Sequence, residues 1–94
     1  MRVVALIPAF NEAETIVQTL TAVADLQLVD EIVVIDDGST DDSFVLASGC
    51  SLGKKVTVLR LKANRGKGGA LNYGRLNASG DAYLLLDADL GPTA

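Results

Sequence analysis

Histidine and tryptophan are absent from the 94-residue sequence, and Cys50 is its single cysteine. One cysteine cannot form an internal disulfide, and a tetrahedral zinc site built from Cys and His is not expected. No apolar run approaches the roughly 20 residues of a membrane span. A lone cysteine also suits a reducing compartment, so we expect a cytoplasmic protein.

Acidic residues are missing from the whole stretch 43–80, which contains seven of the eight basic residues. This stretch carries a charge of +7, whereas the rest of the chain carries −11 from twelve acids and Arg2. Two interpretations stay open: two solvated faces of opposite sign, or one site that holds an anionic ligand between basic residues and metal-bound carboxylates. Aromatic residues are too few to alternate with basic ones, so a nucleic-acid partner is not expected. The seven basic residues are Lys54, Lys55, Arg60, Lys62, Arg65, Lys67 and Arg75.

Hydrophobic residues make up 49% of the chain, enough for one small globular domain. Short apolar runs alternate with segments of helical periodicity, which predicts a β-α-β-α-β-α-β order. This order is typical of an α/β fold with a four-stranded parallel sheet and helices on both faces. We expect strands at 2–8, 31–36, 55–61 and 82–86, with the third at an edge, and helices at 11–26, at 40–48 and from the glycines at 66–69 to 77.

The first two strands each end in a loop with polar side chains. Asn11 and Glu14 have the spacing of a capping box at the start of a helix, and Ser39 with Asp42 is a second candidate cap. Capping does not explain why Asp36 is followed directly by Asp37, since adjacent carboxylates repel. A carboxylate there could accept hydrogen bonds from a nucleobase or from ribose hydroxyls.

A glycine-rich turn follows the third strand. It lacks the first glycine of a Walker A loop and the Ser or Thr after its lysine. Glycines before a helix, together with Arg65 and Lys67, still form a candidate anion site. The alternative is a flexible surface turn.

Asp87 and Asp89 follow the fourth apolar strand, one residue apart. Carboxylate oxygens suit a hard divalent cation such as Mg²⁺ or Mn²⁺. Three residues are weak evidence alone, but ligands of open α/β sheets usually bind at the carboxyl ends of the strands. We therefore expect a metal site formed by Asp87 and Asp89.

Four ordered segments together resemble the family 2 glycosyltransferases of GT-A fold. The glycine-rich segment is most similar to that of the polyprenyl-phosphate sugar transferases, such as dolichyl-phosphate mannose synthase. The resemblance spans essentially all 94 residues but implies only the amino-terminal, nucleotide-binding half of such an enzyme, a Rossmann-like half of a GT-A fold. The segments are IPAFNE at 7–12, VIDDGSTD at 34–41, NRGKGGALN at 64–72 and LDAD at 86–89.

The resemblance implies a nucleoside-diphosphate sugar as the donor. Pro8, Ala9 and Phe10 would line the nucleotide pocket, and Glu12 and Asp37 would contact ribose and base. The acceptor that the finer resemblance implies is a lipid phosphate, which would place the full-length protein at the cytoplasmic membrane surface.

The same resemblance assigns the charged residues. Lys67, with Arg65, would lie near the diphosphate, and Asp87 would lie against the nucleotide-sugar. Asp89 would be catalytic by coordinating the metal that bridges the phosphates. That metal would stabilise the departing diphosphate as a Lewis acid.

A half-domain should be inactive alone, and its apolar edge at 82–86 should favour self-association. Rival interpretations are a non-catalytic nucleotide-binding or metal-binding module, a nucleotidyltransferase half-domain and, more distantly, a receiver-type signalling domain. A nucleotidyltransferase would be expected to carry its glycine-rich signature after the first strand.

Overall fold

A computed structural model describes residues 1–88. Within them the predicted alternation of strands and helices is confirmed, with most boundaries shifted by one to a few residues. The strands are β1 (Val3–Ala9), β2 (Glu31–Asp36), β3 (Lys55–Arg60) and β4 (Ala82–Leu85), and the helices are α1 (Ile16–Ala24), α2 (Ser43–Ser48) and α3 (Gly66–Leu76).

The four strands form one parallel sheet in the order β3-β2-β1-β4. β1 and β2 are fully buried and read as continuous apolar runs, as parallel strands covered on both faces do. β3 is at one edge, as predicted, and β4 is at the other. The carboxyl ends of all four strands therefore lie along one margin of the sheet.

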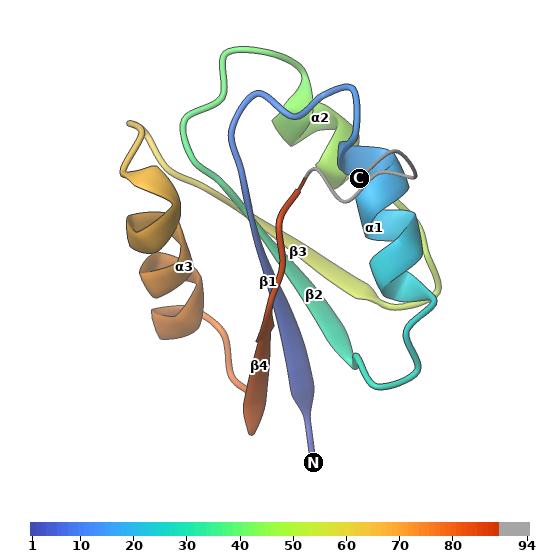
Figure 1. The fold of residues 1–94 in the computed structure, drawn as a ribbon. Helices are drawn as coiled ribbons and strands as arrows, with labels where there is room; N and C mark the ends of the chain where they lie inside the picture. The colour runs from blue at the N-terminus through green and yellow to red at the C-terminus, as the bar shows by residue number, and fades with distance from the viewer. Residues whose placement is uncertain (89–94) are drawn as a thin grey trace.

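Helices cover both faces of the sheet, which confirms the predicted layers. Figure 1 shows α3 on one side of the sheet and α1 with α2 on the other. Alternate residues of each strand supply the two cores, so that Ile7 packs towards α1 whereas Leu6 and Ile35 pack towards α3. At Gly74, a Cβ atom would lie 2.6 Å from Ile35 Cδ1, so α3 approaches the sheet closely because this position has no side chain.

The capping box predicted for Asn11 and Glu14 is wrong. α1 begins only at Ile16, and its N-cap residue, Thr15, makes no side-chain capping bond. Asn11 instead has a left-handed backbone with φ 53°, and its side-chain oxygen accepts from the Thr40 N–H at 2.9 Å. The asparagine therefore ties two loops together instead of starting a helix.

The second predicted cap is also wrong. α2 begins at Ser43, and Asp42 at its N-cap makes no side-chain capping bond. Ser39 accepts from the Asn11 N–H at 2.9 Å, while the neighbouring Asp41 accepts from the Ser43 N–H at 2.9 Å. Ser39 therefore cross-links the loops after β1 and β2, whereas the Asp41 bond stays within the segment that opens α2.

The described helices are short. α3 has 11 residues and is the longest, and among residues 1–88 no helix has the length and apolar character to cross a bilayer.

Candidate active site

A pocket of about 230 Å³ lies at the carboxyl ends of the strands. It is formed by the loops after β1 and β2 and by the turn that opens α3. Six of the residues predicted to contact the donor line it, together with Gly66, one of the glycines of the predicted anion site, and Asn64, which had no predicted role. The six are Pro8, Ala9, Phe10, Glu12, Asp37 and Lys67.

The loop after β1 is held in place by the loop after β2. The Glu12 N–H donates to the buried hydroxyl of Ser43 at 2.7 Å, and the Ala13 N–H reaches Asp41 at 3.2 Å. The Ser43 hydroxyl in turn donates to Asp41. This hydrogen bond to the charged form lowers the pKa of the Asp41 carboxyl below its ordinary value.

The lowered pKa of Asp41 predicts a pH-dependent contribution to stability. A depressed folded-state pKa means that the stabilisation is complete above about pH 4 and is lost as the pH falls through the folded pKa. We expect Asp41→Asn to lower the urea midpoint at pH 6 and to have a smaller effect near pH 3. Asp42→Asn, which removes the adjacent charge without a capping bond, is the control. An Asp41→Asn effect that stays constant with pH would contradict the assignment.

Asp37 joins three parts of the site. Its carboxylate accepts from the Arg65 N–H at 2.7 Å, its N–H donates to Ala9 O at 2.8 Å, and its carbonyl accepts from the Asn64 side chain at 3.3 Å. The Asp37 residue is 3% exposed, yet it lines the pocket. It therefore presents a fixed acceptor to any ligand that enters.

The Asp36 carboxylate lies beside Arg60 and not in the pocket, so the adjacent Asp36 and Asp37 carboxylates have different surroundings. Asp36 is 1% exposed and does not line the pocket, and Arg60 Nε lies 3.7 Å from its Oδ2. The Arg60 guanidinium is stacked over the Phe44 ring, 4.5 Å from its centre. Both carboxylate oxygens of Asp36 lack a hydrogen bond within residues 1–88, so the charge of Arg60 is what offsets the buried carboxylate there.

The glycine-rich turn places its two basic residues differently. Gly66 has φ 81° and opens α3, which puts Lys67 in the first helical turn. Lys67, which lines the pocket, forms an ion pair with Asp87. The Arg65 side chain is instead stacked over Tyr73, 5.4 Å from the ring centre, so Arg65 reaches the site through its N–H.

Asp87 follows β4 at the carboxyl edge, as predicted, and its side chain is half exposed. Its carboxylate forms the ion pair with the Lys67 ammonium. Asp89, the predicted catalytic and second metal ligand, lies outside the described residues. Within residues 1–88 no three His, Cys, Asp or Glu side chains gather as a metal site, so Asp87 is the described candidate ligand.

Two threonines were missed by sequence reasoning. Thr15, the N-cap residue of α1, and Thr19 of α1 both donate to the carbonyl of Ala88, at 3.1 and 2.7 Å. Their spacing of four residues puts both hydroxyls on one helix face, but nothing in the sequence indicates a partner about 70 positions away.

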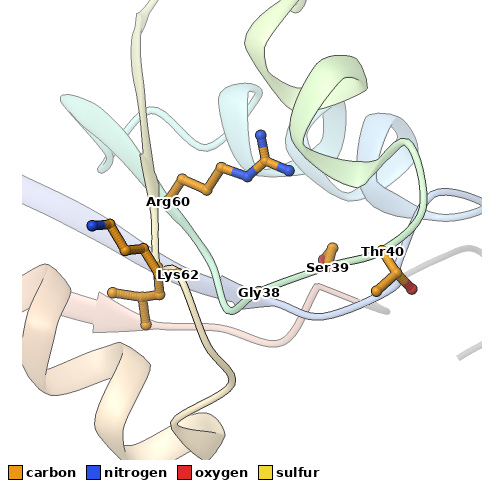
Figure 2. A pocket seen from close by; sticks show the side chains of 6 residues that line it. Gly38, Ser39, Thr40, Arg60 and Lys62 are labelled. Carbon is orange, nitrogen blue, oxygen red and sulfur yellow. The ribbon is translucent and has the colours of Figure 1, made fainter.

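A second hollow of about 460 Å³ lies between the loop after β2 and the end of β3. Figure 2 shows Arg60 and Lys62 at its wall, with their charged groups pointing apart. No predicted site residue lines this hollow, and diverging cations do not form an anion cradle. The smaller pocket is therefore the candidate active site.

Comparison with known proteins gives the affiliation. The family model described as "Glycosyl transferase family 2" matches residues 4–93. The chain belongs to glycosyltransferase family 2. This membership confirms the predicted family and disfavours the nucleotidyltransferase and receiver-domain interpretations.

Curated members of family 2 are similar over most of the chain. Poly-beta-1,6-N-acetyl-D-glucosamine synthase of Staphylococcus aureus (strain COL) is 40% identical over 85 residues, which is 89% of this chain and 21% of that protein. The Staphylococcus epidermidis protein of the same name is 36% identical over the same shares. The chain thus spans about a fifth of the length of these relatives.

Solved structures of glycosyltransferases confirm the fold. S. aureus TarS 1–349 in complex with UDP-GlcNAc superposes with a TM-score of 0.85 and 27% identity, over 95% of this chain and 27% of that one. Glucosyl-3-phosphoglycerate synthase from Mycobacterium tuberculosis, in complex with Mn²⁺, UDP and glucosyl-3-phosphoglycerate, gives 0.71 and 30%, over 93% and 33%. The predicted α/β, Rossmann-like GT-A architecture is confirmed. The finer similarity to polyprenyl-phosphate sugar transferases is not tested by these relatives and stays a prediction.

Proposed function

We propose that residues 1–94 are the donor-binding half of a metal-dependent glycosyltransferase, which transfers a sugar from a nucleoside-diphosphate sugar to an acceptor. The observation that carries this proposal is the pocket itself. Three segments far apart in the sequence bring six predicted donor contacts to one hollow. Family membership and the UDP-containing neighbours support a UDP-sugar as the donor.

The nucleoside would occupy the pocket between the β1 loop and Asp37. Pro8, Ala9 and Phe10 supply the walls, and Phe10 is 44% exposed, so its ring is accessible to a ligand. Asp37 would accept hydrogen bonds from the base or the ribose, and Glu12 from the ribose hydroxyls. An acceptor already fixed by its neighbours costs less entropy when a ligand binds.

The diphosphate would lie towards Lys67, at the start of α3. A lysine in the first turn adds its charge to the positive end of the helix dipole, which favours an anion there. Arg65 would contribute through the field of its charge, because its side chain is stacked on Tyr73.

Asp87, with Asp89, would hold Mg²⁺ or Mn²⁺. A half-exposed carboxylate at a strand end supplies the oxygen ligands that a hard divalent ion prefers. Such a metal supplies Lewis acidity towards the diphosphate. The Mn²⁺ and UDP in the M. tuberculosis synthase structure support this assignment.

The acceptor remains a prediction. A lipid phosphate would follow from the polyprenyl-phosphate resemblance, as would the cytoplasmic membrane surface as the location. A non-catalytic binding module would share the pocket but transfer no sugar in any longer protein that contains it.

Calorimetric titration of the chain with UDP-GlcNAc, with and without Mn²⁺, tests the proposal. We expect binding in the micromolar to millimolar range that strengthens about 10-fold or more when Mn²⁺ is added. The same titration with GDP-mannose tests which nucleobase the pocket prefers. An affinity that does not change with Mn²⁺, or no binding of either donor, would contradict the proposal.

The outer edge of β4 supports self-association as a second part of this proposal. Within residues 1–88, β4 pairs with β1 alone and Leu85 is 58% exposed. Such a strand edge is a template for pairing with another copy. Light scattering across a concentration series tests it, and a monomer at high concentration would count against it.

A further inference from the structure

The carbonyl of Ala88 is bound by two hydroxyls from a distant helix. Thr19 Oγ1 donates to it at 2.7 Å and Thr15 Oγ1 at 3.1 Å. Thr19 is fully buried and Ala88 is 4% exposed. A carbonyl has two lone pairs, so the two donors can satisfy this buried acceptor completely.

The same helix shows what such a threonine does by default. Thr21 Oγ1 donates at 2.7 Å to the carbonyl of Val17, four residues earlier. This local bond is the usual way in which a helical threonine satisfies its hydroxyl. Thr19 instead bonds a residue 69 positions away, so its hydroxyl contributes a tertiary contact.

The bond between Thr19 and Ala88 holds the chain just beyond the end of β4. The register of β4 on β1 ends at Leu85, and the Leu86 N–H donates to Leu6 O at 3.1 Å. Asp87 and Ala88 lie beyond this pairing, and the Ala88 carbonyl contacts Thr19 of α1. The threonines therefore fix the backbone that carries the Asp87 side chain.

We propose that Thr19, assisted by Thr15, is a positioning residue of the donor site. By holding the Ala88 carbonyl, it keeps the Asp87 carboxylate beside Lys67, which lines the pocket, and, if the proposed function holds, in place for the metal. Thr15 Oγ1 also lies 3.4 Å from Glu12 Oε2, so the two threonines adjoin the side of the pocket assigned to the ribose.

Thr19→Val tests this proposal, because valine keeps the shape of threonine and removes its hydroxyl. Thr19→Ser restores a donor, and Thr21→Val makes the same substitution on the same helix where only a local bond is lost. Each variant of the 94-residue chain is titrated with UDP in the presence and absence of Mn²⁺. Amide hydrogen exchange at residues 87 and 88 is measured on the same samples.

We expect Thr19→Val to lower the Mn²⁺-dependent affinity about 10-fold, the lower end of what supporting contacts around metal sites contribute. Its Mn²⁺-free UDP affinity should stay at the wild-type value, and exchange at residues 87 and 88 should accelerate. Thr19→Ser should recover most of the loss, and Thr21→Val should match wild type.

Three results would overturn the role proposed for Thr19. The first is a Thr19→Val affinity for UDP with Mn²⁺ equal to that of Thr21→Val, and the second is a Thr19→Ser affinity as low as that of Thr19→Val. The third is a loss of UDP affinity in Thr19→Val that is the same with and without Mn²⁺. A wild-type chain that binds no UDP would refute the proposed function instead. In that case the amide exchange rates at residues 87 and 88 still test the role of Thr19. Unchanged exchange in Thr19→Val overturns it, and accelerated exchange in this variant alone supports it.

Discussion

Asp87→Asn is expected to remove nearly all of the Mn²⁺-dependent binding of a UDP-sugar. Asparagine keeps the shape of aspartate but loses the anionic oxygen that a hard cation requires. Contacts that only support metal ligands contribute 10–100-fold to metal affinity, so the loss of a direct ligand should cost about 100-fold or more. Calorimetry with UDP-GlcNAc at fixed Mn²⁺ measures this loss.

The control for Asp87→Asn is Asp42→Asn, which removes one exposed carboxylate at the same end of the sheet. Its affinity should stay within about 2-fold of wild type, because an exposed charge is screened by salt over distances beyond a Debye length of roughly 8–10 Å. Equal losses in the two variants would show that net charge, and not a metal ligand, governs the affinity.

Lys67→Met removes the ammonium of the Lys67–Asp87 ion pair and leaves the carboxylate. The variant should bind UDP more weakly without Mn²⁺, because the ammonium no longer balances the charge of the diphosphate. The affinity for Mn²⁺ alone should rise, since Asp87 is released from a competing cation. A fall in both affinities would contradict this division of roles.

Gly38→Ala is expected to destabilise the fold and to weaken donor binding. Gly38 has φ 78°, and an added Cβ would lie 3.0 Å from the backbone nitrogen of Asn64 and 3.1 Å from the carbonyl carbon of Ala63. The left-handed conformation costs an alanine about 1–2 kcal/mol, and displacing the packed backbone costs about 1–3 kcal/mol more. Because Asn64 lines the pocket, the displacement reaches the donor site directly.

Gly53→Ala is the matched control for Gly38→Ala. Gly53 has φ 76°, but nothing lies within 4 Å of an added Cβ. Only the conformational cost remains there, so urea unfolding should show a loss of about 1–2 kcal/mol. Equal losses for the two variants would mean that the contact with Ala63 and Asn64 carries no energy.

The elements and layers of this fold were predictable because each buried strand of a parallel sheet is a continuous apolar run. The meeting of the polar loops was predictable for a related reason: the carboxyl ends of parallel strands lie at one margin. The six pocket residues themselves were predicted from the resemblance to family 2 glycosyltransferases. The roles of Asn11 and Ser39 were not predictable. An oxygen that caps a helix and one that ties two loops together both accept backbone N–H groups, so local spacing cannot tell them apart.

Long-range partners account for the other differences. Asp36 and Asp37 are neighbours in sequence, but successive residues at a strand end point to opposite sides, and only the folded chain shows that Asp36 faces Arg60. Thr19 and Thr21 are the same residue type on one helix, and only the position of Ala88 distinguishes them.

The place of β4 next to β1 has a consequence for the order of folding. The main-chain N–H of Arg2 donates to the Asp81 carboxylate across 79 positions, whereas β1 and β2 pair over a much shorter loop. Closing a longer loop costs more entropy, and non-local pairing slows folding. We therefore expect the three strands β1, β2 and β3 to associate first and β4 to join them afterwards. The nucleoside side of the pocket would then exist before its acidic side, which the last strand delivers.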